Sequence, residues 1–131
     1  MKTTDLMIGD WVLINDAPHK IQAIDSIDAE IQADDELYYI GEDRYHSEDN
    51  IEDILITPEI LEKNGWKDRE NLMELRVNED ICFLWSKGYG VFTGAFINQI
   101  GHYICDFKYV RTLQHLLRRY GLNELANNFK V

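Results

Sequence analysis

Residues 25–53 hold twelve acidic side chains and one basic side chain, Arg44. Like charges at this density repel one another and lower the stability of a folded segment unless salt or a partner offsets them. Tertiary structure elsewhere can form without these charges, so this concentration of charge is not needed to build a core. Its net charge of −11 equals that of the whole chain. We therefore interpret it either as a solvated face or as a recognition surface for something basic.

The remaining composition is that of an ordinary folded protein. The 131 residues are 45% hydrophobic, which argues against disorder and fits one domain. The acidic balance counts against direct nucleic-acid binding and against binding to an anionic membrane. No apolar run reaches the roughly 18 residues of a membrane span, and residues 1–5 lack the apolar stretch of a secretory signal. Two cysteines are too few for a disulfide scaffold, so we expect a cytoplasmic protein.

The first half of the chain alternates between short strand-like segments and turns. Asn15 and Asp16 favour a turn because their side chains hydrogen-bond to nearby backbone, and Pro18 fixes its own φ. The predicted strands are residues 11–14, 19–24, 29–31, 37–40 and 51–56, with a loop over 41–50. Five short strands with acidic connections predict a small antiparallel barrel over about residues 5–56.

The second half predicts a short helix followed by an antiparallel meander. Thr57 suits the N-cap, Pro58 the first helical position, and Gly65 the left-handed conformation that ends a helix. The predicted meander strands are residues 72–77, 81–85, 91–93 and 102–107. Glycines 88 and 90 favour a hairpin rather than a phosphate loop, because they join two strands, and Gly94 indicates a bulge or a close backbone approach.

The last part of the chain predicts an amphipathic helix over residues 109–120. Its apolar stripe centres on Leu113 and Leu117, which we expect to be buried against the second sheet. The polar residues on the opposite side are expected to face solvent; they are Arg111, Gln114, His115 and Arg118. On this interpretation Arg118→Ala costs no more than about 0.5 kcal/mol. Gly121 ends the helix, and Asn123 is expected to cap a second one over residues 124–129.

These elements together predict a β-rich α+β fold. Residues 1–56 form an SH3-like, acidic antiparallel barrel. Residues 57–131 form the short helix, the antiparallel sheet and the C-terminal amphipathic helix. The sequence leaves open whether the two parts are separate domains or one compact domain over residues 1–131.

The chain resembles a known group of proteins in three places. Residues 6–12, Leu-Met-Ile-Gly-Asp-Trp-Val, resemble the start of SH3-like barrels, in which a Gly-Asp turn leads into the first strand. With residues 56–66 and the helix of residues 109–117 after Lys108, they are similar to small uncharacterised bacterial proteins often associated with prophages and other mobile elements. The resemblance implies an intracellular bacterial accessory protein, and it implies no activity, cofactor or catalytic residue.

No metal site is predicted. Cys82 and Cys105 lie in apolar strands and are expected to be buried as small hydrophobic residues. His102 and Asp106 share one strand face while Cys105 points to the other, so they do not converge on zinc. A calcium loop opening at Asp28 would place alanine and tyrosine where glycine and glutamate are required.

No catalytic arrangement is predicted either. His115 follows Cys105 by ten residues but lies on the side of a helix that we expect to face solvent. No serine or cysteine is otherwise matched with a base, so a small hydrolase is the weakest of the functional alternatives. We predict no cofactor and no catalytic residue.

The function favoured by the sequence is a non-enzymatic protein-interaction module with a basic protein partner. The candidate surface combines acids with two adjacent tyrosines and comprises Asp34, Asp35, Glu36, Tyr38, Tyr39, Glu42 and Asp43. Neighbouring strand residues face opposite ways, so one tyrosine points outward unless both sheet faces are covered. The alternative is an acidic DNA mimic that inhibits a nucleic-acid-binding protein. Aromatic residues between acids would favour the module, and regular carboxylate rows would favour the mimic. The sequence does not predict the oligomeric state.

Overall fold

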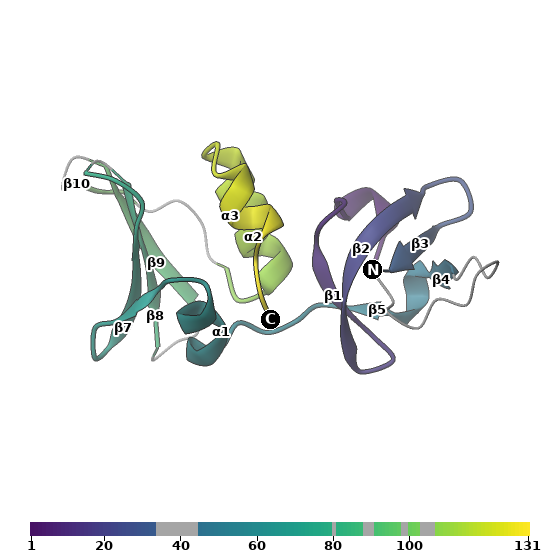
Figure 1. Cartoon of the computed structure of the whole chain (residues 1–131), viewed down its shortest axis with the longest axis horizontal. Helices are drawn as coiled ribbons and strands as arrows, with labels where there is room; N and C mark the ends of the chain where they lie inside the picture. The colour runs from purple at the N-terminus through teal and green to yellow at the C-terminus, as the bar shows by residue number, and fades with distance from the viewer. Residues whose placement is uncertain (34–44, 80, 88–90, 98–99, 103–106) are drawn as a thin grey trace.

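The computed structural model describes the chain except residues 34–44, 80, 88–90, 98–99 and 103–106, and the side chains of residues 91–97 and 100–102. It is a strand-rich α+β structure, as the sequence predicts, and it contains two five-stranded antiparallel sheets (Figure 1). The first sheet has the order β4-β3-β2-β1-β5 and the second the order β10-β9-β8-β7-β6. Helices α2 and α3 lie between the two sheets.

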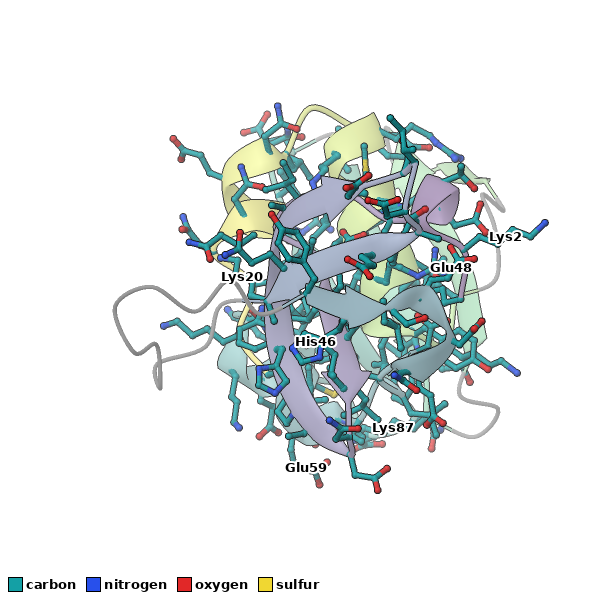
Figure 2. The ribbon with its side chains drawn as sticks, turned by 90° about the vertical axis from the view of Figure 1, so that its right-hand side faces the viewer. Lys2, Lys20, His46, Glu48, Glu59 and Lys87 are labelled. Atoms are coloured by element: carbon teal, nitrogen blue, oxygen red, sulfur yellow. The ribbon has the colours of Figure 1, made fainter. Side chains whose placement is uncertain are left out.

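The first sheet is built from the N-terminal half of the chain. Its strands are β1 (Trp11–Ile14), β2 (Ala17–Asp25), β3 (Glu30–Ala33), β4 (Tyr45–Ser47) and β5 (Ile51–Glu52), with 3-10 turns at Thr3–Asp5 and Glu48–Asn50. Along β1, Val12 and Ile14 are buried in the sheet's own small core, while Trp11 and Leu13 pack on the opposite side against the larger core. Strand periodicity thus gives β1 two covered faces. Figure 2 looks onto the side of this sheet that faces away from the helices, with His46 labelled on β4.

A two-residue turn joins β1 to β2. Asn15 and Asp16 both have positive φ, 52° and 63°, as a tight hairpin turn requires, and these residue types tolerate that conformation. Pro18 lies outside the turn, within β2 and opposite Leu13. The prediction therefore identified the two central residues of the turn, but it also included Ala17 and Pro18, which belong to β2.

A closed barrel is not confirmed, because the first sheet is open. Strands β4 and β5 form its two edges. Strand β4 lies where the sequence predicts a loop, and the predicted strand at residues 37–40 lies outside the described residues. Strand β5 ends at Glu52, not at residue 56, because the chain then leaves the sheet to bury Ile54 and Ile56 in the larger core.

The second half begins with α1 (Pro58–Lys63). The Thr57 hydroxyl accepts a hydrogen bond from the Ile60 N–H at 3.2 Å, and Gly65 has a φ of 86°, so both predicted ends are confirmed. The second sheet follows with β6 (Lys67–Asp68), β7 (Leu72–Arg76), β8 (Ile81–Ser86), β9 (Val91–Ile97) and β10 (Ile100–His102). The β8–β9 register shifts beside Gly94, where a bulge was predicted. Strand β6 was not predicted.

The apolar side of the C-terminal helix packs as predicted. Helix α2 (Val110–Arg119) buries Leu113 and Leu117 in the larger core, which also contains Phe83 of β8. Gly121 has a φ of 76° and ends the helix. Helix α3 (Asn123–Asn127) follows, but Leu122 is its N-cap and no side chain caps it, so the predicted cap is wrong. Among the described residues, no helix is long and apolar enough to cross a membrane.

Candidate functional site

The polar side of α2 faces the first sheet, so its predicted exposure to solvent is wrong. Gln114 is completely buried, and the side chain of Arg118 is only 13% exposed. Arg111 and His115 are also largely covered. The helix lies between two layers, and each layer covers one side of it (Figure 1). An amphipathic pattern reveals the apolar side but does not show that the polar side meets water.

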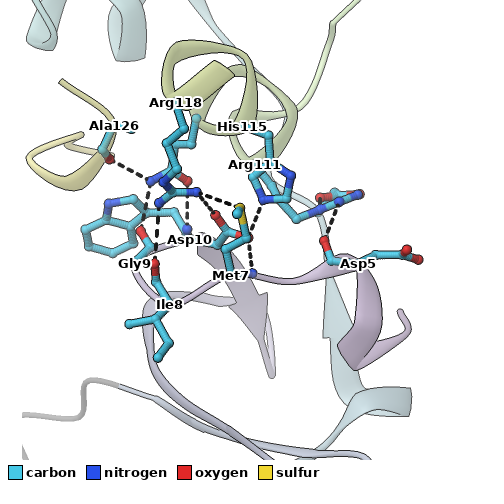
Figure 3. Close-up of polar contacts among 12 residues, drawn as sticks. Asp5, Met7, Ile8, Gly9, Asp10, Arg111, His115, Arg118 and Ala126 are labelled. Atoms are coloured by element: carbon cyan, nitrogen blue, oxygen red, sulfur yellow. Dashed lines mark hydrogen bonds and ion pairs between the residues drawn. The ribbon is translucent and has the colours of Figure 1, made fainter. Parts of the chain in front are cut away.

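Asp10 is the centre of this polar interface (Figure 3). Its fully buried carboxylate accepts hydrogen bonds from Arg118 Nη1 at 2.8 Å, His115 Nε2 at 2.7 Å and the Met7 N–H at 2.8 Å. An ionised carboxylate only accepts, so Nε2 of His115 carries the hydrogen. Burying a charge is costly unless it is paired and hydrogen-bonded, and these three donors meet that requirement.

Gln114 connects three parts of the chain through its buried amide. Its Oε1 accepts from the Trp11 N–H at 2.9 Å, and its Nε2 donates to the carbonyls of Gly9 at 2.8 Å and Ala126 at 3.0 Å. Gly9 has a φ of 94°, and a Cβ there would lie 3.2 Å from Arg118 Nη2. Glycine therefore permits both the local conformation and the close approach of the arginine.

A second ion pair joins α2 to the segment after β5. Arg111 donates to Asp53 through Nε at 3.0 Å and Nη2 at 3.2 Å, and its Nη1 donates to the Asp5 carbonyl at 3.1 Å. This two-point contact raises the pKa of the guanidinium above its usual range. The helix is thus held to the N-terminal half at two places along its length.

The C-terminal residues add hydrogen bonds to both halves. Trp11 Nε1 donates to the Phe129 carbonyl at 2.7 Å, and Lys20 Nζ donates to the Asn127 carbonyl. Asn64, at the end of α1, donates to the Lys130 carbonyl and accepts from the Lys130 N–H, both at 2.8 Å. The end of the chain is therefore tied to the first sheet and to α1.

An acidic hollow lies at one end of the first sheet. It has a volume of about 240 Å³ and is lined by Leu13, Asn15, Asp16, Asp49, Asn50 and Glu52. Within the described ranges of the chain, no basic side chain lines it. In the part of the chain that the structure describes, no three His, Cys, Asp or Glu side chains are placed to hold a metal ion. The hollow offers carboxylate and amide oxygens to hydrogen-bond donors such as ammonium or guanidinium groups.

Cys82 is buried, as predicted, and its environment disfavours the thiolate. Its Sγ lies 3.4 Å from Glu74 Oε1, on the side of β8 that faces away from α2. Burial and the Glu74 carboxylate raise the thiol pKa to about 11, so it is protonated at neutral pH and does not act as a nucleophile. Cys105 and Asp106 lie outside the described residues, and the backbone of His102 lies in β10.

The predicted interaction residues fall in one stretch of the first half, within residues 34–44. Asp34, Asp35, Glu36, Tyr38, Tyr39, Glu42 and Asp43 all lie outside the described residues. The described parts of the same acidic stretch carry two strongly exposed apolar side chains. Ile27 is 93% exposed in the β2–β3 turn, and Tyr45 is 46% exposed on β4. The neighbouring described acids are Asp25, Asp28, Glu30, Glu48 and Asp49.

Comparisons of the chain with protein-family models, with curated proteins and with solved structures found no match. The function is therefore inferred from the geometry and chemistry of this chain alone.

Proposed function

We propose that the chain is a non-enzymatic protein-interaction module whose acidic first sheet receives a basic protein partner. The observation that carries the proposal is the exposure of Ile27 and Tyr45 within an acidic stretch. An exposed aliphatic and an exposed aromatic side chain supply apolar contact area, and the surrounding carboxylates supply attraction and orientation. This mixture of aromatic and acidic residues favours a protein partner over a role as a DNA mimic.

The distribution of basic residues supports the same proposal. Residues 1–56 contain only three lysines and arginines, and Lys2 and Lys20 are the two among them that the structure describes. Figure 2 labels Lys2 on the right and Lys20 on the left of the view, and Lys20 Nζ donates to the Asn127 carbonyl of α3. Much of the acidic charge thus has no lysine or arginine beside it in sequence. Such a surface attracts a basic partner over a distance set by the ionic strength.

We also propose that the first sheet has an SH3-like architecture. An SH3-like architecture is supported by residues 6–12 leading into β1 and by the separate small core of the first sheet. In such an architecture the partner would dock at the strand ends and connecting loops, next to the acidic hollow. A cytoplasmic location is proposed with it, on the composition alone.

Affinity capture from cells that make the protein, with the full chain as bait, tests the proposal. The test variant is Asp28→Asn, Glu30→Gln and Asp49→Asn combined. The control is Glu62→Gln, Glu79→Gln and Glu124→Gln combined, which removes the same charge from exposed acids of the second half. We expect the parent and control to capture the same basic protein, and the test variant to lose it.

Two further measurements on the captured protein sharpen the result. Added salt should weaken binding mainly through a slower association rate, and Ile27→Ser with Tyr45→Ser should weaken it mainly through faster dissociation. Equal capture by the test variant and the parent would contradict the proposal. Release of the captured protein by duplex DNA would support the mimic instead.

A further inference from the structure

Helix α2 carries the densest positive charge of this acidic chain. Between Val110 and Arg119 it has three arginines and one histidine and no acidic residue. Arg118 is turned toward Asp10 and is used in the interface with the first sheet. Arg111, His115 and Arg119 are spaced four residues apart, so they lie on successive turns along one side of the helix.

These three basic residues line a small hollow at the protein surface. It has a volume of about 160 Å³, and its lining is completed by Thr112 and Leu116. Among the described residues, no acidic side chain lines the hollow. The carboxylates of Asp10 and Asp53 contact His115 and Arg111, so they neutralise part of the charge from behind. Asp5 adds a third carboxylate near Arg111, so the positive charge left for a ligand is mainly that of Arg119, which has no carboxylate partner among the described residues.

Hydrogen-bond donors remain available in the hollow. Arg111 uses Nε, Nη2 and Nη1 once each, which leaves one N–H on each terminal nitrogen. Arg119 is exposed and has no hydrogen bond or ion pair among the described residues, and the Thr112 hydroxyl has no hydrogen bond there either. His115 Nε2 donates to Asp10, so the donors left for an anion in the hollow are those of Arg111, Arg119 and Thr112.

We propose that this hollow binds one tetrahedral oxyanion of the phosphate or sulfate type. Two guanidinium groups and a hydroxyl, held on adjacent turns of a helix fixed at both sides, match the several oxygens of such a group. The carboxylates of Asp5, Asp10 and Asp53 nearby make the site suited to a single anion and unfavourable for a long polyanion. The ligand is either a free anion or a phosphate group carried on a peptide. This site is independent of the acidic surface of the first sheet.

The first experiment is a sulfate titration of the full chain, labelled with nitrogen-15 and followed by NMR at constant ionic strength. Sulfate should shift the backbone amides of Thr112 and Arg119 and the Nε–H signal of Arg111, along one saturable curve. Arg119→Gln should weaken sulfate binding roughly tenfold, because it removes a charged donor. Arg76→Gln is the matched control: it removes one charge from another exposed arginine, and it should leave the affinity unchanged.

A second variant and two other probes complete the test. Thr112→Val should weaken sulfate binding by a few fold, since the hydroxyl is one donor among several. Inorganic phosphate and a phosphoserine peptide should shift the same signals. If the peptide binds more tightly than inorganic phosphate, the ligand is a phosphate group on a peptide. If the two bind equally, the ligand is a free anion. Shifts spread over all exposed basic residues, without saturation, would overturn the proposal. Equal weakening by Arg76→Gln and Arg119→Gln would overturn it as well.

Discussion

The two sides of α2 are buried by different kinds of contact. One side presents Leu113 and Leu117 to the second sheet, in the larger hydrophobic core. The other side presents Gln114 and Arg118 to the segment that leads into β1, and these two side chains contact it through hydrogen bonds and an ion pair. Apolar packing tolerates many shapes of similar volume, whereas the polar interface requires each donor to keep its acceptor. The polar interface should therefore be the more sensitive to small chemical changes.

The largest expected effect lies on the apolar side. Leu117→Asp should lower the free energy of unfolding by about 5 kcal/mol, because it buries an unpaired charge and leaves a packing defect. Leu125→Asp, on the partly exposed side of α3, should cost less than about 1 kcal/mol. Urea titrations of the two variants measure the difference. Equal losses would show that the apolar side of α2 is not the one packed against the second sheet.

Removal of the central carboxylate should have the next largest effect. Asp10→Ala leaves Arg118, His115 and the Met7 N–H without their buried acceptor, and it should cost about 3 kcal/mol. Asp5→Ala removes an equal charge from an exposed position five residues earlier. Its cost should stay within about 0.5 kcal/mol. A thermal or urea midpoint for Asp10→Ala equal to that of Asp5→Ala would mean that the polar interface adds no stability.

Two neighbouring arginines provide the closest comparison between covered and exposed positions. Arg118→Ala should cost about 2 kcal/mol because it leaves the Asp10 carboxylate buried with one donor fewer. Arg119→Ala should cost within about 0.5 kcal/mol. From the sequence alone, we expected the smaller loss of unfolding free energy for Arg118→Ala. If unfolding experiments return the smaller value for both variants, Arg118 is a surface residue after all.

The smallest effect concerns pH at Cys82, far from the polar interface. A folded-state thiol pKa raised from 9.0 to about 11 means that the native state holds the proton more tightly than the unfolded state. This contribution to stability is fully present below pH 9.0 and is lost as the pH rises toward about 11. Iodoacetamide should therefore modify Cys82 slowly in the native protein near neutral pH, as measured by mass spectrometry of its peptide. Rapid modification there would contradict the raised pKa.

Local signals explain what the sequence predicted well. Thr57 and Pro58 begin α1, Gly65 and Gly121 end helices, and Leu113 with Leu117 defines the buried stripe of α2. Each signal acts within one or two turns of the chain, so it can be read from neighbouring residues. Strands β4 and β6 are edge strands of three and two residues, too short to show an alternating pattern, and they were missed for that reason.

The candidate site depended on information that is not local. Asp10 and Arg118 are separated by more than a hundred residues, and the residues around each of them do not predict this contact. The available signal was charge. A helix with three arginines and no acid attracts carboxylates from elsewhere in the chain, and Asp10, after Gly9 at the start of a strand, offers such a carboxylate. This signal indicates that arginines of the helix form ion pairs. It does not show which carboxylate they contact, since the chain has 24 acidic residues.

The central claim is that the polar side of α2 is held to the first sheet through Asp10, and a double-mutant cycle tests it most directly. Unfolding free energies would be measured for the parent, Asp10→Ala, Arg118→Ala and the double variant. The 2.8 Å contact predicts a coupling energy of about 2 kcal/mol, so the double variant should be little worse than Asp10→Ala alone. Additive losses, with a coupling energy within about 0.5 kcal/mol of zero, would contradict the claim.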